Sequence, residues 1–342
     1  MKLSRRKFMV TVIGGVGILI GSYFLAISTG KLKPLKTAQK EKAKVFLVRT
    51  SDRRAGIRKL LSQFDLNDYH GKTVALKANF NSADPFPATT HIDTLKNIVK
   101  GLKEAGVDDI VLAERSGMGN TRTVLEQLGV FNLSKKLGFK VVVLDEEGRD
   151  RWMKVGEDGT HWLRGFYLSK VFLEADRVVQ TCCLKTHRFG GHFTMSLKNS
   201  VGLVAKWIPG EPYNYMVELH MSPYQRLMIA EINRFYRVDL VVMDALKAFV
   251  TGGPERGDLA EPGLMLASRD RVALDAVGVA ILRIHGSTKE VMDGRIFELE
   301  QIRRAAEIGV GVKSASDIRL IPLNNESLKD VEKIESILKS QG

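Results

Sequence analysis

Cysteine is scarce in this sequence of 342 residues, and the two cysteines present, Cys182 and Cys183, are adjacent. Neighbouring cysteines seldom bridge each other, so the sequence encodes no framework of disulfides. It also lacks the paired cysteines and histidines that are spaced to hold a structural zinc ion. Two thiols cannot supply the ligands of a four-iron four-sulfur cluster, and we therefore expect no intrinsic cluster of that kind.

Phosphate-binding motifs and a basic patch are absent as well. Neither the G-x-G-x-x-G fingerprint nor a Walker loop occurs. Lys and Arg outnumber Asp and Glu by 52 to 39, but much of this excess lies in residues 2–44, where Glu41 is the sole acid. The rest of the chain has no basic stripe interleaved with aromatic residues, so we expect no nucleic-acid partner. A small anionic ligand or a membrane surface suits the mild basic excess better.

Charge is missing from residues 11–28, which form one apolar run. Residues 4–8 precede it and match the twin-arginine export signal, with Ser, two Arg, one free position and Phe. Residues 26–28 fit a small-x-small cleavage site, yet the run is also near the length that spans a bilayer. A cleaved signal and a membrane anchor both stay open. We expect export to the periplasm or cell surface, with the amino-terminal segment contacting the membrane.

The rest of the chain divides into a linker and one domain. Residues 29–44 are polar and rich in Lys, which predicts a linker. Residues 45–342 alternate strand-like apolar runs with segments of helical spacing, which predicts an α/β domain with a mostly parallel, Rossmann-like sheet flanked by helices. Strands are expected at 45–48, 73–76, 110–113, 140–144, 176–180, 238–243, 263–267 and 317–321. The main helices are expected at 53–64, 92–105, 123–128, 194–204, 223–235, 271–284 and 296–308, with a loop at 210–223.

Residues 181–204 are unusually dense in groups that bind ligands. Two thiols, several cations, two histidines, a Gly-Gly pair and an Asn follow directly after an apolar run of strand length. Structural needs alone rarely gather so many such groups, which are Cys182, Cys183, Lys185, His187, Arg188, His192, Lys198 and Asn199.

Polar clusters follow four of the predicted strands. In an open parallel sheet, ligands bind beyond the carboxyl ends of the strands, so these clusters are expected to form one site. A cation just past a buried strand suits a phosphate or carboxylate, and the glycines before a helix expose backbone N–H donors. The predicted ligand-binding residues are Lys77, Asn79, Ser116, Gly117, Lys198, Asn199 and Gly253.

Catalytic and metal-binding roles are expected for a smaller set. Lys185 would hold the anion, and His187 or Asp244 would transfer a proton. Because a Gly-Gly pair separates His187 from His192, a loop folding back could bring both imidazoles to one metal ion, with Cys182 as a further ligand. Structural alternatives stay open for each: a satisfied core histidine, a buried thiol at a strand end, and a capping role for Asp244.

At these residues the chain resembles a family catalogued as domain of unknown function 362. The matching pieces lie within roughly residues 45–321 and are 77–79, 114–117, 185–187, 196–202, 243–257 and 268–277. Some relatives resemble iron–sulfur proteins with additional ferredoxin-type cysteines, which this chain lacks. A fainter resemblance, to nickel-dependent lactate racemases, implies that His187, His192 and Lys198 serve a nickel-pincer cofactor.

Three hypotheses for function follow. The first is an exported enzyme that acts on a small anionic ligand, with nickel, iron or zinc as the candidate metal. The second is a non-catalytic extracytoplasmic protein that binds an anion or a metal. The third is an accessory protein that passes electrons to, or assembles a cofactor with, an iron–sulfur partner, which an exposed thiol at Cys182 would favour.

Overall fold

A computed structural model describes residues 41–342. The signal or anchor predicted at residues 1–28 lies outside these residues, as does most of the predicted linker. The strands are β1 (Ala43–Arg49), β2 (Thr73–Lys77), β3 (Asp109–Glu114), β4 (Lys140–Val143), β5 (Trp152–Val155), β6 (Phe166–Ser169), β7 (Arg177–His187), β8 (His192–Thr194), β9 (Leu240–Phe249), β10 (Leu259–Ala260), β11 (Leu264–Ser268) and β12 (Ile318–Pro322). No helix in the described part of the chain is both long and apolar enough to cross a membrane.

One large sheet organises the described residues, with the strand order β12-β1-β11-β9-β7-β2-β3-β4. The strands from β9 to β4 run parallel to their neighbours, and so do β1 and β12. Only β11 on this path is antiparallel to both neighbours. The mostly parallel α/β architecture predicted from the sequence is therefore confirmed, and the carboxyl ends of β9, β7, β2 and β3 meet at one edge of the sheet.

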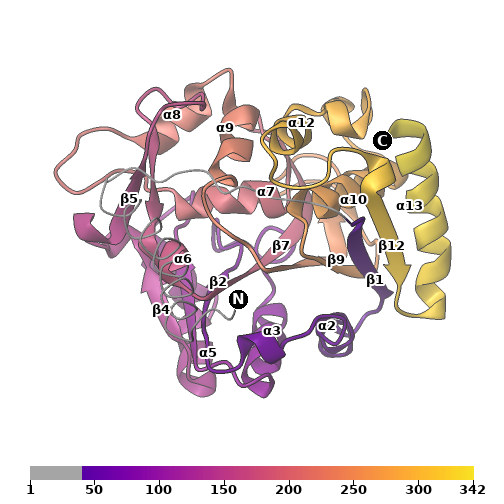
Figure 1. Cartoon of the computed structure of the whole chain (residues 1–342), viewed down its shortest axis with the longest axis horizontal. Helices are drawn as coiled ribbons and strands as arrows, with labels where there is room; N and C mark the ends of the chain where they lie inside the picture. The colour runs from indigo at the N-terminus through magenta and orange to yellow at the C-terminus, as the bar shows by residue number, and fades with distance from the viewer. Residues whose placement is uncertain (1–40) are drawn as a thin grey trace, which may run out of the picture.

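Helices cover both faces of this sheet (Figure 1). They are α2 (Arg53–Leu61), α3 (Ile92–Glu104), α4 (Thr121–Gln127), α5 (Val130–Leu137), α6 (Lys170–Glu174), α7 (Ser196–Asn199), α8 (Tyr215–Met221), α9 (Gln225–Ile232), α10 (Arg271–Ile284), α11 (Lys289–Met292), α12 (Glu300–Glu307) and α13 (Leu328–Gln341). Apolar residues of α2, α3 and α5 form the core on one face, and those of α10, α12 and α13 form the core on the other. Such double cover explains why the central strands are apolar on both sides.

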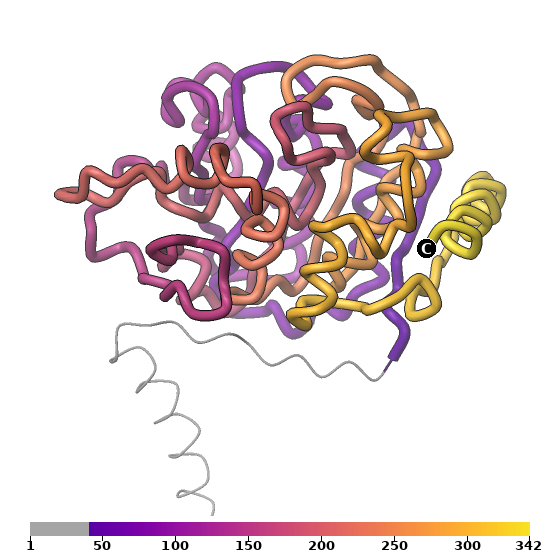
Figure 2. Tube along the Cα trace, turned by 90° about the horizontal axis from the view of Figure 1, so that it is seen from above, coloured from indigo at the N-terminus to yellow at the C-terminus, as the bar shows by residue number. Residues whose placement is uncertain are grey.

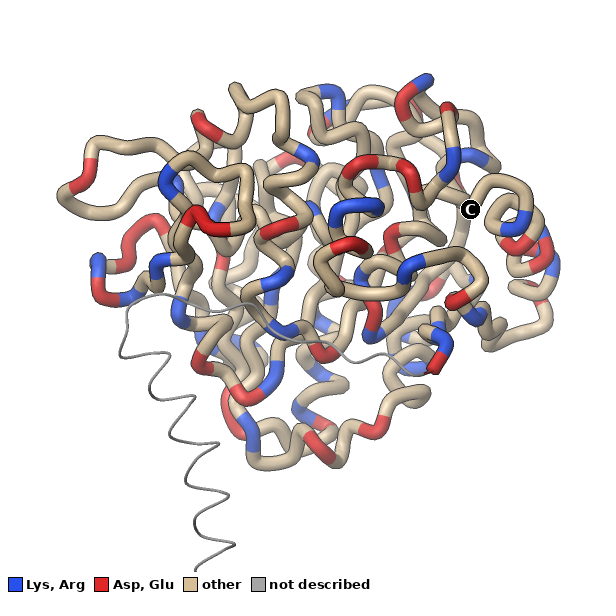
Figure 3. The backbone as a smooth tube through the Cα atoms, turned by 45° about the horizontal axis from the view of Figure 1, so that its top comes forward, with Lys and Arg blue, Asp and Glu red and all other residues tan. Residues whose placement is uncertain are grey.

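Helix α10 shows how the sequence specifies an element of this core. Asp270 caps it by accepting a hydrogen bond from the backbone N–H of Ala273 at 2.8 Å. Nearly all of the helix is buried, which agrees with its apolar composition on every face. At the periphery, α13 lies along the outer side of the molecule (Figure 2). Acidic and basic residues are interspersed along the described backbone (Figure 3).

The structure differs from the sequence-based expectations around the dense stretch. Strand β7 continues to His187, so Lys185 and His187 lie on a strand and not in the loop after it. The helix expected at 194–204 is divided, because β8 takes its first residue and only the short α7 and the 3-10 helix η4 (Ser200–Leu203) follow. The loop expected at 210–223 contains α8, which Asn214 caps by accepting hydrogen bonds from two backbone N–H groups.

Candidate functional site

A cavity of about 240 Å³ opens at the carboxyl ends of β2, β3 and β7. Seven of the predicted site residues line it: Lys77, Asn79, Gly117, Lys185, His187, Lys198 and Asn199. The cavity is also lined by residues that the sequence analysis did not assign to the site, among them Asn81, Arg115, Thr194, Gly202 and His220. Four strand ends were expected to contribute to one site, and the cavity lies at three of them.

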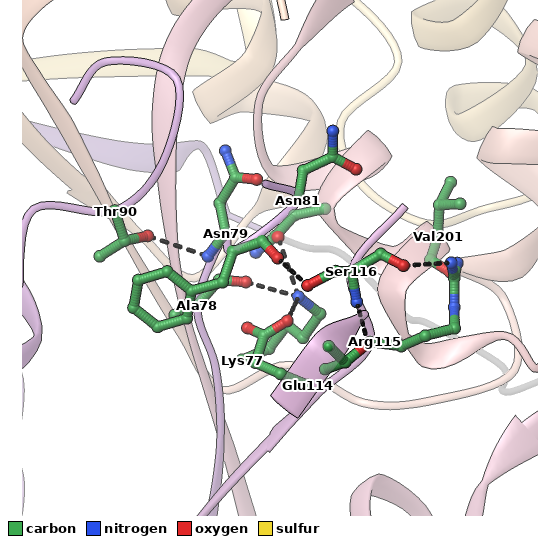
Figure 4. A network of polar contacts seen from close by, with 12 residues as sticks. Lys77, Ala78, Asn79, Asn81, Thr90, Glu114, Arg115, Ser116 and Val201 are labelled. Carbon is green, nitrogen blue, oxygen red and sulfur yellow. Dashed lines mark hydrogen bonds and ion pairs between the residues drawn. The ribbon is translucent and has the colours of Figure 1, made fainter. Parts of the chain in front are cut away.

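A buried ion pair forms one wall of the cavity (Figure 4). Lys77 Nζ lies 2.7 Å from Glu114 Oε2, and it also donates to the carbonyl of Ala78 at 2.5 Å and to Asn199 Oδ1 at 3.4 Å. Burial lowers the pKa of Lys77 and raises that of Glu114, and the attraction between the two groups opposes both shifts. Because an ammonium group has three N–H donors, these contacts occupy all the donors of Lys77.

The loops after β2 and β3 are tied together next to this pair (Figure 4). Ser116 Oγ donates to the carbonyl of Phe80 at 2.6 Å, and the backbone N–H of Gly117 donates to Asn81 Oδ1 at 3.1 Å. Ser116 does not line the cavity and instead holds its wall. Arg115 is buried beside it, and this burial lowers the pKa of its guanidinium group to about 10.

Lys185 contributes a second buried ammonium group from β7. Its Nζ donates to the carbonyl of Ala88 and, at 3.3 Å, to that of Pro254. Burial lowers its pKa to about 8. Gly253 has a φ of +62°, and a Cβ at this position would lie 1.9 Å from the carbonyl oxygen of Thr186. Glycine therefore lets the turn pack against β7 and places Pro254, not Gly253 itself, in the cavity wall.

Lys198 and His187 lie side by side over Gly191. A Cβ on this glycine would be 2.8 Å from Lys198 Cε and 3.0 Å from His187 Nδ1. Burial, with Lys185 and Arg115 nearby, lowers the pKa of Lys198 to about 7. Burial and the charge of Lys198 hold the pKa of His187 well below its usual value, so the imidazole is neutral at neutral pH.

The element that carries Lys198 is anchored from behind. Asp275 of α10 accepts hydrogen bonds from the backbone N–H groups of Ser196 and Leu197 at 2.9 and 3.0 Å. These are the first residues of α7, whose N–H groups have no partner within the helix. Burial raises the pKa of Asp275 to about 7. The position of Lys198 is thus set by a helix on the opposite side of α7.

Several residues that line the cavity have a buried polar atom without a partner among the described residues. These atoms are His187 Nδ1, Glu114 Oε1, Thr194 Oγ1 and Arg115 Nε. Buried polar groups in folded proteins are nearly always hydrogen-bonded, so this wall of the cavity is unusual. The unpaired set contains both donors and acceptors.

Comparison with known proteins identifies the family. Residues 74–280 match the model of the family described as Domain of unknown function (DUF362). The chain belongs to this family. It is 29% identical over 208 residues to the thylakoid-associated protein sll1697 of Synechocystis sp., a match that covers 59% of this chain and 60% of that protein. Its fold is similar, with a TM-score of 0.40 and 17% identity, to the lactate racemase apoprotein from Thermoanaerobacterium thermosaccharolyticum, over 70% of this chain and 58% of that one.

Asp244 of this DUF362 protein does not line the cavity. Its Oδ2 accepts hydrogen bonds from Arg53 Nε at 2.7 Å and Thr94 Oγ1 at 2.6 Å, and its Oδ1 accepts one from the N–H of Leu246. The carboxylate that was predicted to transfer a proton is therefore engaged in an ion pair between β9, α2 and α3.

The structure does not gather the residues predicted as metal ligands into one group. Within residues 41–342, no group of three or more His, Cys, Asp or Glu side chains is placed to hold a metal ion. The charged groups near His192 are Arg226, Glu290 and Glu300, whereas those near His187 are Lys198, Lys185 and His220. Both cysteines are fully buried, and burial raises the pKa of each thiol, that of Cys183 to about 12.

Two site residues that sequence reasoning missed had signals of different strength. His220 lies on α8, and the capping residue Asn214 followed by apolar residues at helical spacing could have revealed that helix. Arg115 directly precedes Ser116, which was predicted, but an arginine in a loop ordinarily suggests an exposed side chain. Only the fold of the DUF362 chain shows that it is buried.

Proposed function

We propose that this protein is an enzyme that binds a small anionic substrate in the cavity and transfers protons with the side chains that line it. The observation that carries the proposal is the imbalance of charge there. The cations Lys77, Arg115, Lys185 and Lys198 face one carboxylate, Glu114. Burying a charge without a partner is costly, and an anionic ligand would offset that cost.

The pKa values of the lining groups favour catalysis over binding alone. Lys198 and Lys185, with pKa values of about 7 and about 8, change charge near neutral pH, and His187 is neutral and unpaired at Nδ1. Groups with such pKa values donate and accept protons efficiently at neutral pH. A protein that only captured anions would gain little from lowering the charge of its own lysines.

Export by the twin-arginine route and a location outside the cytoplasmic membrane are consistent with a relative described as thylakoid-associated. Nickel, iron or zinc stays a proposal without a ligand set among the described residues. The buried thiols of Cys182 and Cys183 do not support the hypothesis of an electron-transferring accessory protein.

Calorimetry with inorganic phosphate and a panel of small carboxylates tests the proposal. At pH 6, where Lys198 is cationic, we expect the full-length protein to bind at least one of these anions. Lys198→Met should weaken that binding about tenfold or more, because a charged hydrogen bond is lost. Lys313→Met is the matched control, since Lys313 is exposed and does not line the cavity.

The bound anion is then incubated with the protein and followed by NMR. Its chemical conversion supports the enzyme, whereas binding without conversion leaves the non-catalytic binding protein as the better description. Equal affinities in wild type and Lys198→Met, or an equal loss in Lys313→Met, would remove the cavity from consideration as the binding site.

A further inference from the structure

Lys198 differs from the other cations of the cavity in having no partner. Lys77 and Lys185 donate to carbonyl or carboxylate oxygens, and Arg115 donates to the carbonyl of Val201 at 2.5 Å. No hydrogen bond or ion pair within residues 41–342 engages the amine of Lys198. Its side chain lines the cavity, so the amine is available to a molecule bound there.

We propose that Lys198 is a nucleophile that forms an imine with the carbonyl group of a 2-oxo acid bound in the cavity. This inference deepens the proposed function and rests on it, because the carboxylate of the oxo acid is the anion that the remaining cations hold. It names both the class of substrate and the residue that bonds to it.

The protonation state of Lys198 suits this role. An amine attacks a carbonyl carbon only when it is unprotonated, and lysines serve as nucleophiles where burial and neighbouring cations disfavour the charged form. Both causes lower the pKa of Lys198. Burial is the larger one, and the charges of Lys185 and Arg115 add to it. The unprotonated amine of Lys198 is therefore accessible near neutral pH.

The neighbours of Lys198 supply the other requirements. His187 Nδ1 is unpaired and lies against the same point above Gly191 as Lys198 Cε, so a proton acceptor stands next to the amine. Lys185 lines the cavity and uses two of its three N–H donors within the protein. Its third donor can hold a carboxylate that sits beside the reacting carbonyl.

The reaction balances without an oxidant or a reductant. The nitrogen lone pair of Lys198 bonds to the carbonyl carbon, and the C=O pair moves to the oxygen, which takes one proton from the solvent. His187 accepts a proton from the nitrogen and returns it to the hydroxyl group, which leaves as water. The product is a protonated imine, which draws electrons from the adjacent C–H and C–C bonds and labilises them.

Reductive trapping tests this assignment. The full-length protein is incubated at pH 7 with pyruvate or 2-oxoglutarate and sodium cyanoborohydride, whose hydride adds to the imine carbon. We expect a mass increase of one reduced oxo acid per chain, located at Lys198 by peptide mapping. Propanal, an uncharged aldehyde, should label this residue at least tenfold more slowly than the oxo acid does.

Lys198→Arg separates nucleophilicity from charge. This variant should no longer be trapped by the reductant. Its affinity for the oxo acid, measured by calorimetry without reductant, should stay within about threefold of the wild type. Lys313→Arg should retain both. Oxo acid binding by the wild type without trapping, or label spread over surface lysines, overturns the imine and leaves anion binding intact. Absence of binding for every anion tested would overturn the proposed function as well.

Discussion

At Lys198, burial and the neighbouring cations both disfavour the protonated amine. Burial lowers its pKa to about 7 from 10.5. Between these two pH values the unfolded chain binds a proton that the folded protein does not bind. The free energy of unfolding therefore rises with pH through this interval, and below pH 7 the folded state bears the full cost of the buried charge.

Lys198→Met should therefore be more stable than the wild type at pH 6, by about 2 kcal/mol after allowance for partial exposure of the side chain. This advantage should shrink as the pH rises from 7 toward 10.5. Urea unfolding of both proteins at pH 6 and pH 9 measures it. The control Lys313→Met should show a difference from wild type that does not change with pH, and the same flat behaviour in Lys198→Met would contradict the lowered pKa.

At the scale of the element, short helices decide the shape of the cavity. Gly202 lies in η4, and a Cβ at this position would be 2.5 Å from Lys77 Cε and 2.8 Å from Lys77 Nζ. The ammonium group has little freedom to move aside, because it is held by Glu114 and the carbonyl of Ala78. The close approach of η4 to β2 thus depends on a residue without a side chain.

Gly202→Ala should displace Lys77 from Glu114, lower the free energy of unfolding by about 1–3 kcal/mol and weaken anion binding at least fivefold. Gly101→Ala in α3 is the matched control, because its Cβ would also meet a side chain, that of Leu61. It should change stability without changing affinity. Unaltered affinity in Gly202→Ala would show that Lys77 and η4 do not shape the binding site. Unfolding curves and calorimetry supply both quantities.

The sequence was most informative where an element is long and apolar. Strand β2 and helix α10 were predicted at nearly their observed bounds. Burial on both sides leaves a continuous apolar run in β2. In α10 it leaves an apolar segment that begins at a capping residue. The cation positions Lys77 and Lys185 could be assigned to the site because both follow the strands predicted at 73–76 and 176–180. Parallel strands bring those ends together.

The remaining differences arise from contacts between residues that are distant in the sequence. Asp275 anchors α7 across 79 residues, and no local pattern marks that contact. His187 and His192 are paired across β7 and β8 but have different surroundings, and His192 adopts a φ of 59°, which is rare outside glycine. Their spacing suggested that they share one metal ion. Spacing does not show which way each side chain faces, so it could not reveal their different surroundings.

At the scale of the whole molecule, Asp244 joins the sheet to two helices. Its carboxylate on β9 binds Arg53 of α2 and Thr94 of α3, residues that are 191 and 150 positions away in the sequence. The ion pair with Arg53 is largely buried. Removing one partner of such a pair leaves a charge without compensation, which destabilises the folded state strongly.

Asp244→Asn should therefore lower the free energy of unfolding by about 2–3 kcal/mol and leave anion affinity within twofold of the wild type. Urea unfolding and calorimetry on the same samples measure the two effects. Glu146→Gln is the matched change from acid to amide, because Glu146 forms an exposed ion pair with Arg122 and such pairs stabilise little. If Asp244→Asn instead kept its stability but lost the conversion of the bound anion, the proton-transfer role first predicted for Asp244 would be restored, and the catalytic site would have to extend from the cavity to β9.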